Sequence, residues 1–162
     1  MRAARYYGNS DIRIEEIDEP TVGAGEVGID VAWCGICGTD LHEYKDGPIF
    51  CPSPGHPHPI SGEDAPITLG HEFSGVVVDA GKKAFDKRTN KPFKGGEPVT
   101  SEEMLWCAQC RPCADGQPNH CERLDEIGFN VNGAYAKYMV VPARTVWSLE
   151  PLRRVYKGDD IF

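Results

Sequence analysis

The sequence lacks any apolar run that approaches the length of a membrane span, and its first residues contain no apolar stretch like that of a signal peptide. It also lacks an excess of positive charge, since 17 basic and 25 acidic residues give a net charge of −8. A surface of this sign repels phosphate backbones, so we expect no nucleic-acid partner and no membrane partner. These features together predict a cytoplasmic protein.

The 162 residues suit one domain with many turns. Apolar residues make up 40% and charged residues 26%, which is an ordinary globular composition. With 18 glycines and 13 prolines, short strands are favoured over long helices. We therefore predict a fold that is mainly β with short helices, one of them near 39–44, and a proline-rich loop at 47–68. The apolar patterns predict strands at 2–7, 11–17, 27–33, 73–79, 97–100 and 135–141.

One glycine pattern matches a dinucleotide fingerprint in letters but not in context. It is the G-x-G-x-x-G formed by Gly23, Gly25 and Gly28. A dinucleotide site needs an apolar strand before the glycines and a helix after them. Here Asp18-Glu19-Pro20 precedes them and a strand is expected to follow. We interpret these residues as turn glycines and assign them no cofactor.

Seven cysteines stand in a sequence without an export signal, where clustered thiols indicate metal ligands rather than disulfides. Four thiolates satisfy the tetrahedral preference of zinc and leave no open position, which is typical of a structural site. Two disulfides would need an oxidising compartment, and the spacing differs from that of common ferredoxin clusters. The sequence thus predicts a zinc lobe at about 101–125. Its four ligands have the spacing C-x2-C-x2-C-x7-C, at Cys107, Cys110, Cys113 and Cys121.

A second set of zinc donors lies near the predicted strand at 27–33. Cys37 and His71 are candidate ligands, Glu72 is adjacent, and Cys34 is an alternative to Cys37 that these residues alone leave open. A catalytic zinc takes three protein ligands and keeps one position for water or substrate. The simpler interpretation is two buried thiols and a core histidine, because isolated cysteines and histidines are common in protein cores.

Other polar residues surround these donors in the sequence. Thr39 and His42 supply a hydroxyl and an imidazole, which can pass a proton. His56 and His58 flank Pro57 in the long loop. We expect these two to be solvated histidines, because neighbours fixed by a proline rarely converge on one ion.

Three features in this order resemble the zinc-containing medium-chain dehydrogenase/reductase family, which includes alcohol dehydrogenases. They are Cys37-Gly38-Thr39-Asp40-Leu41-His42, then Gly70-His71-Glu72, then the four-cysteine lobe. The resemblance covers residues 1–149 and corresponds to the family's GroES-like N-terminal domain. Residues 33–44 and 46–50 resemble its (R,R)-2,3-butanediol dehydrogenase branch most, with sorbitol and other polyol dehydrogenases as near neighbours. This implies a partly open β-barrel with a zinc-binding lobe, from a family whose full-length members are usually homo-oligomers.

The resemblance implies roles for particular residues. The thiol directly before Gly-Thr-Asp is the family's catalytic zinc ligand, which selects Cys37 over Cys34. His71 matches the histidine ligand and Glu72 the carboxylate beside it. The four cysteines of the lobe match the family's structural zinc site.

The remaining roles that the resemblance implies concern the transfer of the substrate alcohol's proton to solvent. Thr39 matches the hydroxyl that takes the proton of the substrate alcohol, and His42 matches the solvent end of that relay. The implied reaction is NAD-dependent oxidation of a secondary alcohol or diol, of the 2,3-butanediol to acetoin type, in which zinc stabilises the alkoxide.

The chain departs from the family pattern after its last predicted strand. The family's Rossmann domain is missing, so we expect the chain alone to bind no NAD and to be inactive by itself. Glu150, in Glu150-Pro151-Leu152, resembles the family's third zinc-site carboxylate, but it follows the strand so directly that its reach to the zinc is in doubt. Residues 153–160 match nothing in the family, which predicts a non-family tail at 150–162.

Two alternatives stay open. One is a polyol dehydrogenase domain of the sorbitol or xylitol type, and the other is a zinc-stabilised β-module without enzymatic activity. A zinc hydrolase or deaminase is disfavoured, because the H-x-E followed by P-C-x-x-C that such deaminases carry is absent.

Overall fold

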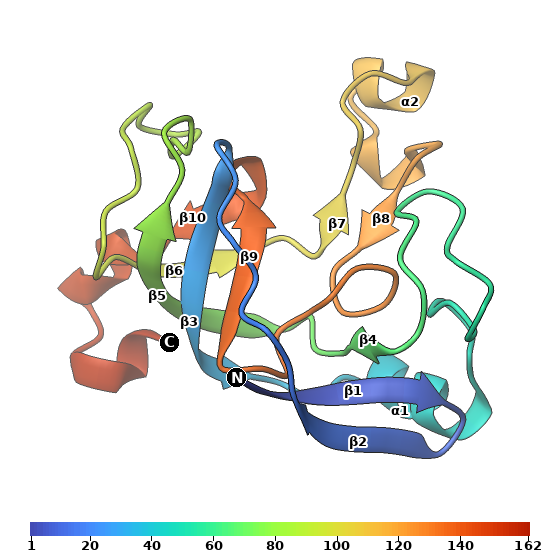
Figure 1. The fold of residues 1–162 in the computed structure, drawn as a ribbon. Coiled ribbons are helices and arrows are strands. Elements are labelled where there is room, and N and C mark those ends of the chain that lie inside the picture. The colour runs from blue at the N-terminus through green and yellow to red at the C-terminus, as the bar shows by residue number, and fades with distance from the viewer.

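A five-stranded antiparallel sheet forms the centre of the structure, a computed structural model that describes all 162 residues (Figure 1). Its strand order is β10-β6-β5-β3-β9. In the long central pair, Cys34 at the end of β3 lies opposite Phe73 at the start of β5. This register brings the residues after β3 beside those before β5. The strands are β3 (Glu26–Cys34), β5 (Phe73–Ala80), β6 (Pro98–Ser101), β9 (Tyr138–Pro142) and β10 (Val146–Ser148).

Two smaller antiparallel sheets flank the central one. The first has the order β2-β1-β4, from β1 (Arg2–Gly8), β2 (Asp11–Glu16) and β4 (Ile67–Thr68). The second is the short pair β7 (Met104–Leu105) and β8 (Asp125–Glu126), at the root of the cysteine lobe that extends toward α2 in Figure 1. The sheets do not close on themselves. The mainly β fold, with a partly open arrangement, is therefore confirmed.

The main core follows from alternation along the central strands. Val27 and Ile29 of β3 are fully buried, because every second side chain of the strand faces the same side. Each such side chain contributes about 1.5–3 kcal/mol on burial. Gly28 lies between them, and Tyr138 of the neighbouring strand occupies the space that a side chain there would fill. Other large members of this core are Phe73, Val77, Phe93, Val99, Ile127, Met139, Val141 and Val146.

A smaller apolar cluster stands behind the candidate site. It consists of Tyr6, Cys51, Leu69 and Phe129, with Tyr135 against it. These residues come from β1, the proline-rich loop, the segment before His71 and the segment after β8. The cluster therefore joins four distant parts of the chain just beneath the second donor set.

The helices are short. The longest, α1 (Gly38–Asp46), exceeds the single turn expected at 39–44. Its first turn is closed by the carboxylate of Asp40, which accepts a hydrogen bond of 2.8 Å from the backbone N–H of Cys37 at the N-cap. No helix has the length and apolar character that crossing a membrane requires. The others are α2 (Arg111–Ala114), η1 (Pro118–His120), η2 (Ala143–Thr145), η3 (Glu150–Arg154) and η4 (Gly158–Ile161).

The structure differs from the sequence prediction in several details. The last long strand begins at Tyr138 rather than at 135, because the N–H groups of residues 133–135 bind the carbonyls of residues 68–70 instead. Strands β4, β7, β8 and β10 are too short for their alternation to stand out in the sequence. Residues 150–162, predicted to be a non-family tail, form η3 and η4, and Ile161 is buried. The domain boundary at residue 149 stays a prediction.

Candidate metal centres

The four cysteines of the lobe converge. The sulfur atoms of Cys107, Cys110, Cys113 and Cys121 all lie within 4.8 Å of one another, and none is in a disulfide. The sulfurs of Cys110 and Cys113 lie 3.4 Å apart. Four thiolates this close repel one another unless a cation stands between them. The donor set and its spacing fit a closed, tetrahedral zinc site.

Backbone N–H groups donate hydrogen bonds to two of these sulfurs, those of Cys107 and Cys121. Gln109 and Cys110 donate to the sulfur of Cys107 at 3.4 and 3.3 Å. Ala108 adopts a positive φ of 59°, the conformation of a tight turn between two ligands. The two N–H groups lower the pKa of Cys107 to about 6. Cys121 receives two further N–H groups, from Cys107 and Arg123.

Cys113 shows the opposite tendency. Desolvation, and hydrogen bonding to the neighbouring thiols, raise the pKa of Cys113 to about 12. The lobe also has no buried residue anywhere from 101 to 126. Neither an apolar core nor the thiols alone can hold it together, so the structure of the lobe depends on what the four sulfurs bind.

The second donor set also converges. One ligand atom each from Cys37, His71 and Glu72 lies within 4.8 Å of the other two. Cys37 is placed by the start of α1 and His71 by the turn before β5. The backbone bond from Gly35 N–H to the carbonyl of Glu72, 2.7 Å, fixes the two segments side by side. These donors line a hollow of about 440 Å³. Its other lining residues are Thr39, Phe50, Ser101, Glu103, Glu126 and Phe129.

The geometry decides between the two candidate thiols. Cys34 is not a member of the converging set. Its sulfur packs against Gly70, so closely that a β-carbon added to Gly70 would lie only 2.9 Å from it. The thiol donates to the carbonyl of Gly35 at 3.6 Å. Burial raises the pKa of Cys34 to about 12. Cys37 is therefore the thiol that the fold presents to His71.

The imidazole of His71 lies between two carboxylates, one next to each ring nitrogen. Its Nδ1 lies 3.7 Å from the carboxylate of Asp40, and neither of these two buried atoms has a hydrogen-bond partner. The other Asp40 oxygen accepts the hydroxyl of Tyr135 at 2.9 Å. The opposite ring nitrogen of His71, Nε2, lies 3.8 Å from Glu103. A carboxylate behind one nitrogen is the arrangement that aims the other nitrogen at a metal.

The sequence matches the family described as alcohol dehydrogenase GroES-like domain over residues 23–151.

The chain belongs to the alcohol dehydrogenase GroES-like family.

This GroES-like domain is similar in sequence and structure to parts of several named dehydrogenases. The chain is 69% identical over 148 residues to the (R,R)-butanediol dehydrogenase of Neisseria gonorrhoeae, covering 90% of this chain and 40% of that protein. It is 52% identical over 156 residues to the scyllo-inosose 3-dehydrogenase of Thermotoga maritima, covering 94% and 38%. The crystal structure of 2R,3R-butanediol dehydrogenase from Bacillus subtilis superposes with a TM-score of 0.79 at 39% identity, covering 91% and 40%. The chain spans about 40% of the length of these relatives.

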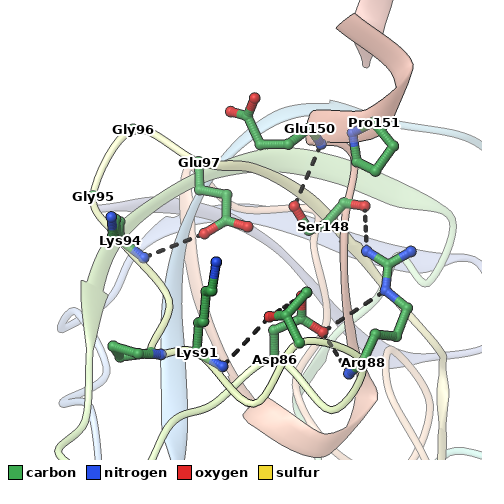
Figure 2. Close-up of a pocket in the computed structure, with 12 residues that line it drawn as sticks. Asp86, Arg88, Lys91, Lys94, Gly95, Gly96, Glu97, Ser148, Glu150 and Pro151 are labelled. Carbon is green, nitrogen blue, oxygen red and sulfur yellow. Dashed lines mark hydrogen bonds and ion pairs between the residues drawn. The ribbon is translucent and has the colours of Figure 1, made fainter.

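Some predicted site residues of this GroES-like domain lie away from the donor set of Cys37, His71 and Glu72. Glu150, the doubtful third ligand, lies in η3 and pairs with Arg153 at 3.0 Å. Figure 2 shows Glu150 at a separate polar hollow of about 470 Å³, beside Ser148 and across from Asp86 and Arg88. The structure does not bring Glu150 to Cys37 and His71.

The other histidines are also separate. His42 is exposed on α1, and its Nδ1 lies 3.6 Å from Asp46 rather than in the hollow. His56 is exposed, while His58 contacts Asp125 at 3.4 Å, so the two do not share an ion site. Gly28, the last glycine of the G-x-G-x-x-G pattern, lies within β3 rather than ahead of a helix.

Sequence reasoning missed five residues that line the hollow, and two of them, Glu103 and Glu126, are acidic. At the root of the cysteine lobe, Glu103 directly precedes β7 and Glu126 lies in β8, and both line the hollow. Burial, followed by the charge of Glu103, raises the pKa of Glu126. No motif marks either glutamate in the sequence, because only the pairing of β7 with β8 carries them to the site.

Proposed function

We propose that this chain is the zinc-binding catalytic domain of an NAD-dependent oxidoreductase that acts on secondary alcohols or vicinal diols, of the 2,3-butanediol to acetoin type. One observation carries the proposal. A thiol, an imidazole and a carboxylate, from Cys37, His71 and Glu72, converge at the wall of a hollow with the hydroxyl of Thr39 beside them. Two of the relatives named above are called butanediol dehydrogenases.

Cys37, His71 and Glu72 would hold the catalytic zinc. When bound, such an ion supplies a positive charge that stabilises an alkoxide on the substrate. The side chains of this chain then have separate tasks. The carboxylate of Asp40 lies 3.7 Å from Nδ1 of His71, which leaves Nε2 for the ion. Phe129 packs on the same ring, with 4.7 Å between ring centroids.

Thr39 is the proposed proton acceptor. Its hydroxyl lies 3.6 Å from the sulfur of Cys37 and lines the hollow. His42 stands three residues further along α1, on the same helix face, and is exposed beside Asp46. We propose that a proton taken by Thr39 at its oxygen leaves toward His42 and solvent.

The charges around the hollow bear on the class of substrate. Glu72, Glu103 and Glu126 line it, and no lysine or arginine does. Such a surface disfavours substrates with a carboxylate or phosphate group. Neutral alcohols and diols match it better.

The cofactor needs residues of another kind. All strand pairs of this chain are antiparallel, so none of its residues form the parallel unit that holds a dinucleotide. We therefore propose that NAD is bound by residues outside these 162. The chain alone is expected to bind zinc and to show no turnover.

Two measurements test the proposal. Metal analysis should give two zinc ions per chain, with one lost in His71→Ala and the other lost in Cys107→Ser/Cys110→Ser. For activity, the chain is fused to the remaining part of the Neisseria relative and assayed for NAD reduction with 2,3-butanediol. Activity in this fusion, abolished by Cys37→Ser, supports the function, whereas a fusion that folds with two zinc ions and stays inactive refutes it.

The polyol alternative has an observation of its own, the 52% identity to a scyllo-inosose 3-dehydrogenase. The same fusion separates the two. Faster turnover of scyllo-inosose than of 2,3-butanediol would favour the polyol alternative.

A further inference from the structure

Glu43 is a buried carboxylate without a cationic partner. It lies on α1 and is fully buried, with an exposed fraction of 0%. No lysine, arginine or histidine forms an ion pair with it. An ionised carboxylate in such a place is unfavourable unless hydrogen bonds compensate for the lost water. The partners it does have therefore show what the residue is for.

Those partners are three consecutive backbone N–H groups of the proline-rich loop. Ile49 donates to the carboxylate at 3.0 Å and Cys51 at 3.3 Å, and Phe50 donates to it as well. This segment belongs to no helix or strand, so no neighbouring backbone orders it. A single side chain thus fixes the path of three residues.

The same residue is anchored at its other end. The backbone carbonyl of Glu43 accepts the hydroxyl of Tyr6 at 2.8 Å and the N–H of Gly47 at 3.0 Å. Thr39 lies one turn earlier on the same helix, and Cys37 is its N-cap. Glu43 therefore couples the helix that carries Thr39 to the loop that carries Phe50.

Phe50 is where this coupling reaches the site. The residue is 47% exposed, yet it lines the hollow together with Thr39 and His71. Its centroid lies 5.7 Å from that of Phe129, which in turn packs on His71. These two phenylalanines are the only large apolar side chains among the lining residues.

We infer that Glu43 is a positioning residue that holds Phe50 as an apolar wall of the substrate hollow, so that the site favours alcohols with an alkyl group over fully hydroxylated ones. This inference rests on the proposed function, because it concerns the same hollow. The carboxylate acts through the loop backbone and touches no substrate.

Amide hydrogen exchange tests the anchor without any activity. In the ¹⁵N-labelled 162-residue chain, the amides of Ile49, Phe50 and Cys51 should exchange slowly although they lie in a loop. Glu43→Gln replaces one acceptor oxygen by a donor that faces these N–H groups, and should speed their exchange at least about tenfold. The matched control is Glu63→Gln, the same change at an exposed position of the same loop. Fast exchange in the unmodified chain would overturn the inference.

Alcohol binding tests the consequence. The chain is loaded with Co²⁺, and 1-butanol or glycerol is added in increasing concentration. Binding is followed by the change in those cobalt absorption bands that Cys37→Ser abolishes, because these bands report on the centre that contains Cys37. The ratio of the glycerol Kd to the 1-butanol Kd should fall about tenfold in Phe50→Ala, the scale of one to two methylenes in an apolar pocket. Glu43→Gln should lower it similarly, and the double variant should show no further change.

Each other result counts against the inference. An unchanged ratio of the two Kd values in Phe50→Ala would show that Phe50 is not an apolar wall of the substrate hollow. An unchanged ratio in Glu43→Gln would show that Glu43 does not position Phe50. A double variant whose ratio falls well beyond that of Phe50→Ala shows that Glu43 acts independently. If Glu43→Gln does not fold, Glu43→Asp, which withdraws the carboxylate by one methylene, takes its place with the same expectations. Absence of the Cys37-dependent cobalt bands would refute the proposed function instead, while hydrogen exchange still decides the anchor.

Discussion

The cysteine lobe should open when its metal ligands are removed, while the central sheet stays folded. The perturbation is the double replacement Cys107→Ser/Cys121→Ser, which removes the two sulfurs that accept all four N–H···S bonds. The reason is the absence of a core. No residue from 101 to 126 is buried, so only hydrogen bonds and the bound ion oppose the entropy of the chain.

The magnitude follows from the structure. Ordering the roughly 15 residues between the first and last cysteine costs about 1 kcal/mol each, or about 15 kcal/mol. The six backbone hydrogen bonds inside residues 107–121 and the four N–H···S bonds return about 1 kcal/mol each. The remaining deficit of about 5 kcal/mol is exceeded by the roughly 10–16 kcal/mol that a structural zinc site supplies. Without the ion the lobe should therefore be open more than about 99% of the time.

Trypsin provides the assay, because the bond between Arg123 and Leu124 lies in the lobe, whereas Pro112 blocks cleavage after Arg111. In the double variant, cleavage after Arg123 should be faster by about a thousandfold, while far-UV circular dichroism of the sheet is retained. The control is Cys34→Ser, which alters a thiol outside both clusters. Cleavage at the rate of the unmodified chain would refute the argument that the lobe has no stability of its own.

Three further predictions concern stability and metal content. Ile29→Ala, at a fully buried position of β3, should lower the free energy of unfolding by about 3–4 kcal/mol, seen as a lower urea midpoint at an unchanged m-value. Burial alone would raise the pKa of Asp86, but the N–H of Arg88 and the hydroxyl of Thr89 outweigh it and hold this pKa below its ordinary value. That contribution is present above the ordinary carboxyl pKa of about 4 and is lost as the pH falls through the lowered one, so Asp86→Asn should lose less stability between about pH 5 and pH 2 than the unmodified chain. Glu150→Gln should keep two zinc ions per chain, because its carboxylate faces Arg153, and loss of one ion on metal analysis would place Glu150 in the catalytic centre after all.

Features formed by neighbours in sequence could be predicted closely. The alternation of Val27 and Ile29 marks β3, and the structure confirms it within a residue or two. The cysteine spacing places four thiols on two tight turns, and the sulfurs meet as expected. α1 was underestimated, because the capping contact between Asp40 and Cys37 that starts it depends on where the chain leaves β3.

Features formed by distant residues required the fold. Cys37 and His71 meet because β3 and β5 pair in one particular register, and a shift of that register would present Cys34 or separate the two segments. Glu103 and Glu126 reach the hollow through the two-residue pairing of β7 with β8, which leaves no periodic signal in the sequence. The same holds for Glu43, whose importance lies in three N–H groups of a loop without regular structure.

The sequence by itself determined the strand pattern, the four-thiol lobe and the donor types of a second centre, since each depends on spacings of a few residues that backbone geometry converts directly into contacts. The family resemblance had already selected Cys37 over Cys34. Only the tertiary structure decided that Glu150 lies elsewhere, and which carboxylates and rings complete the hollow. Those contacts join segments tens of residues apart, and their geometry is set by strand register and core packing rather than by any local preference of the chain.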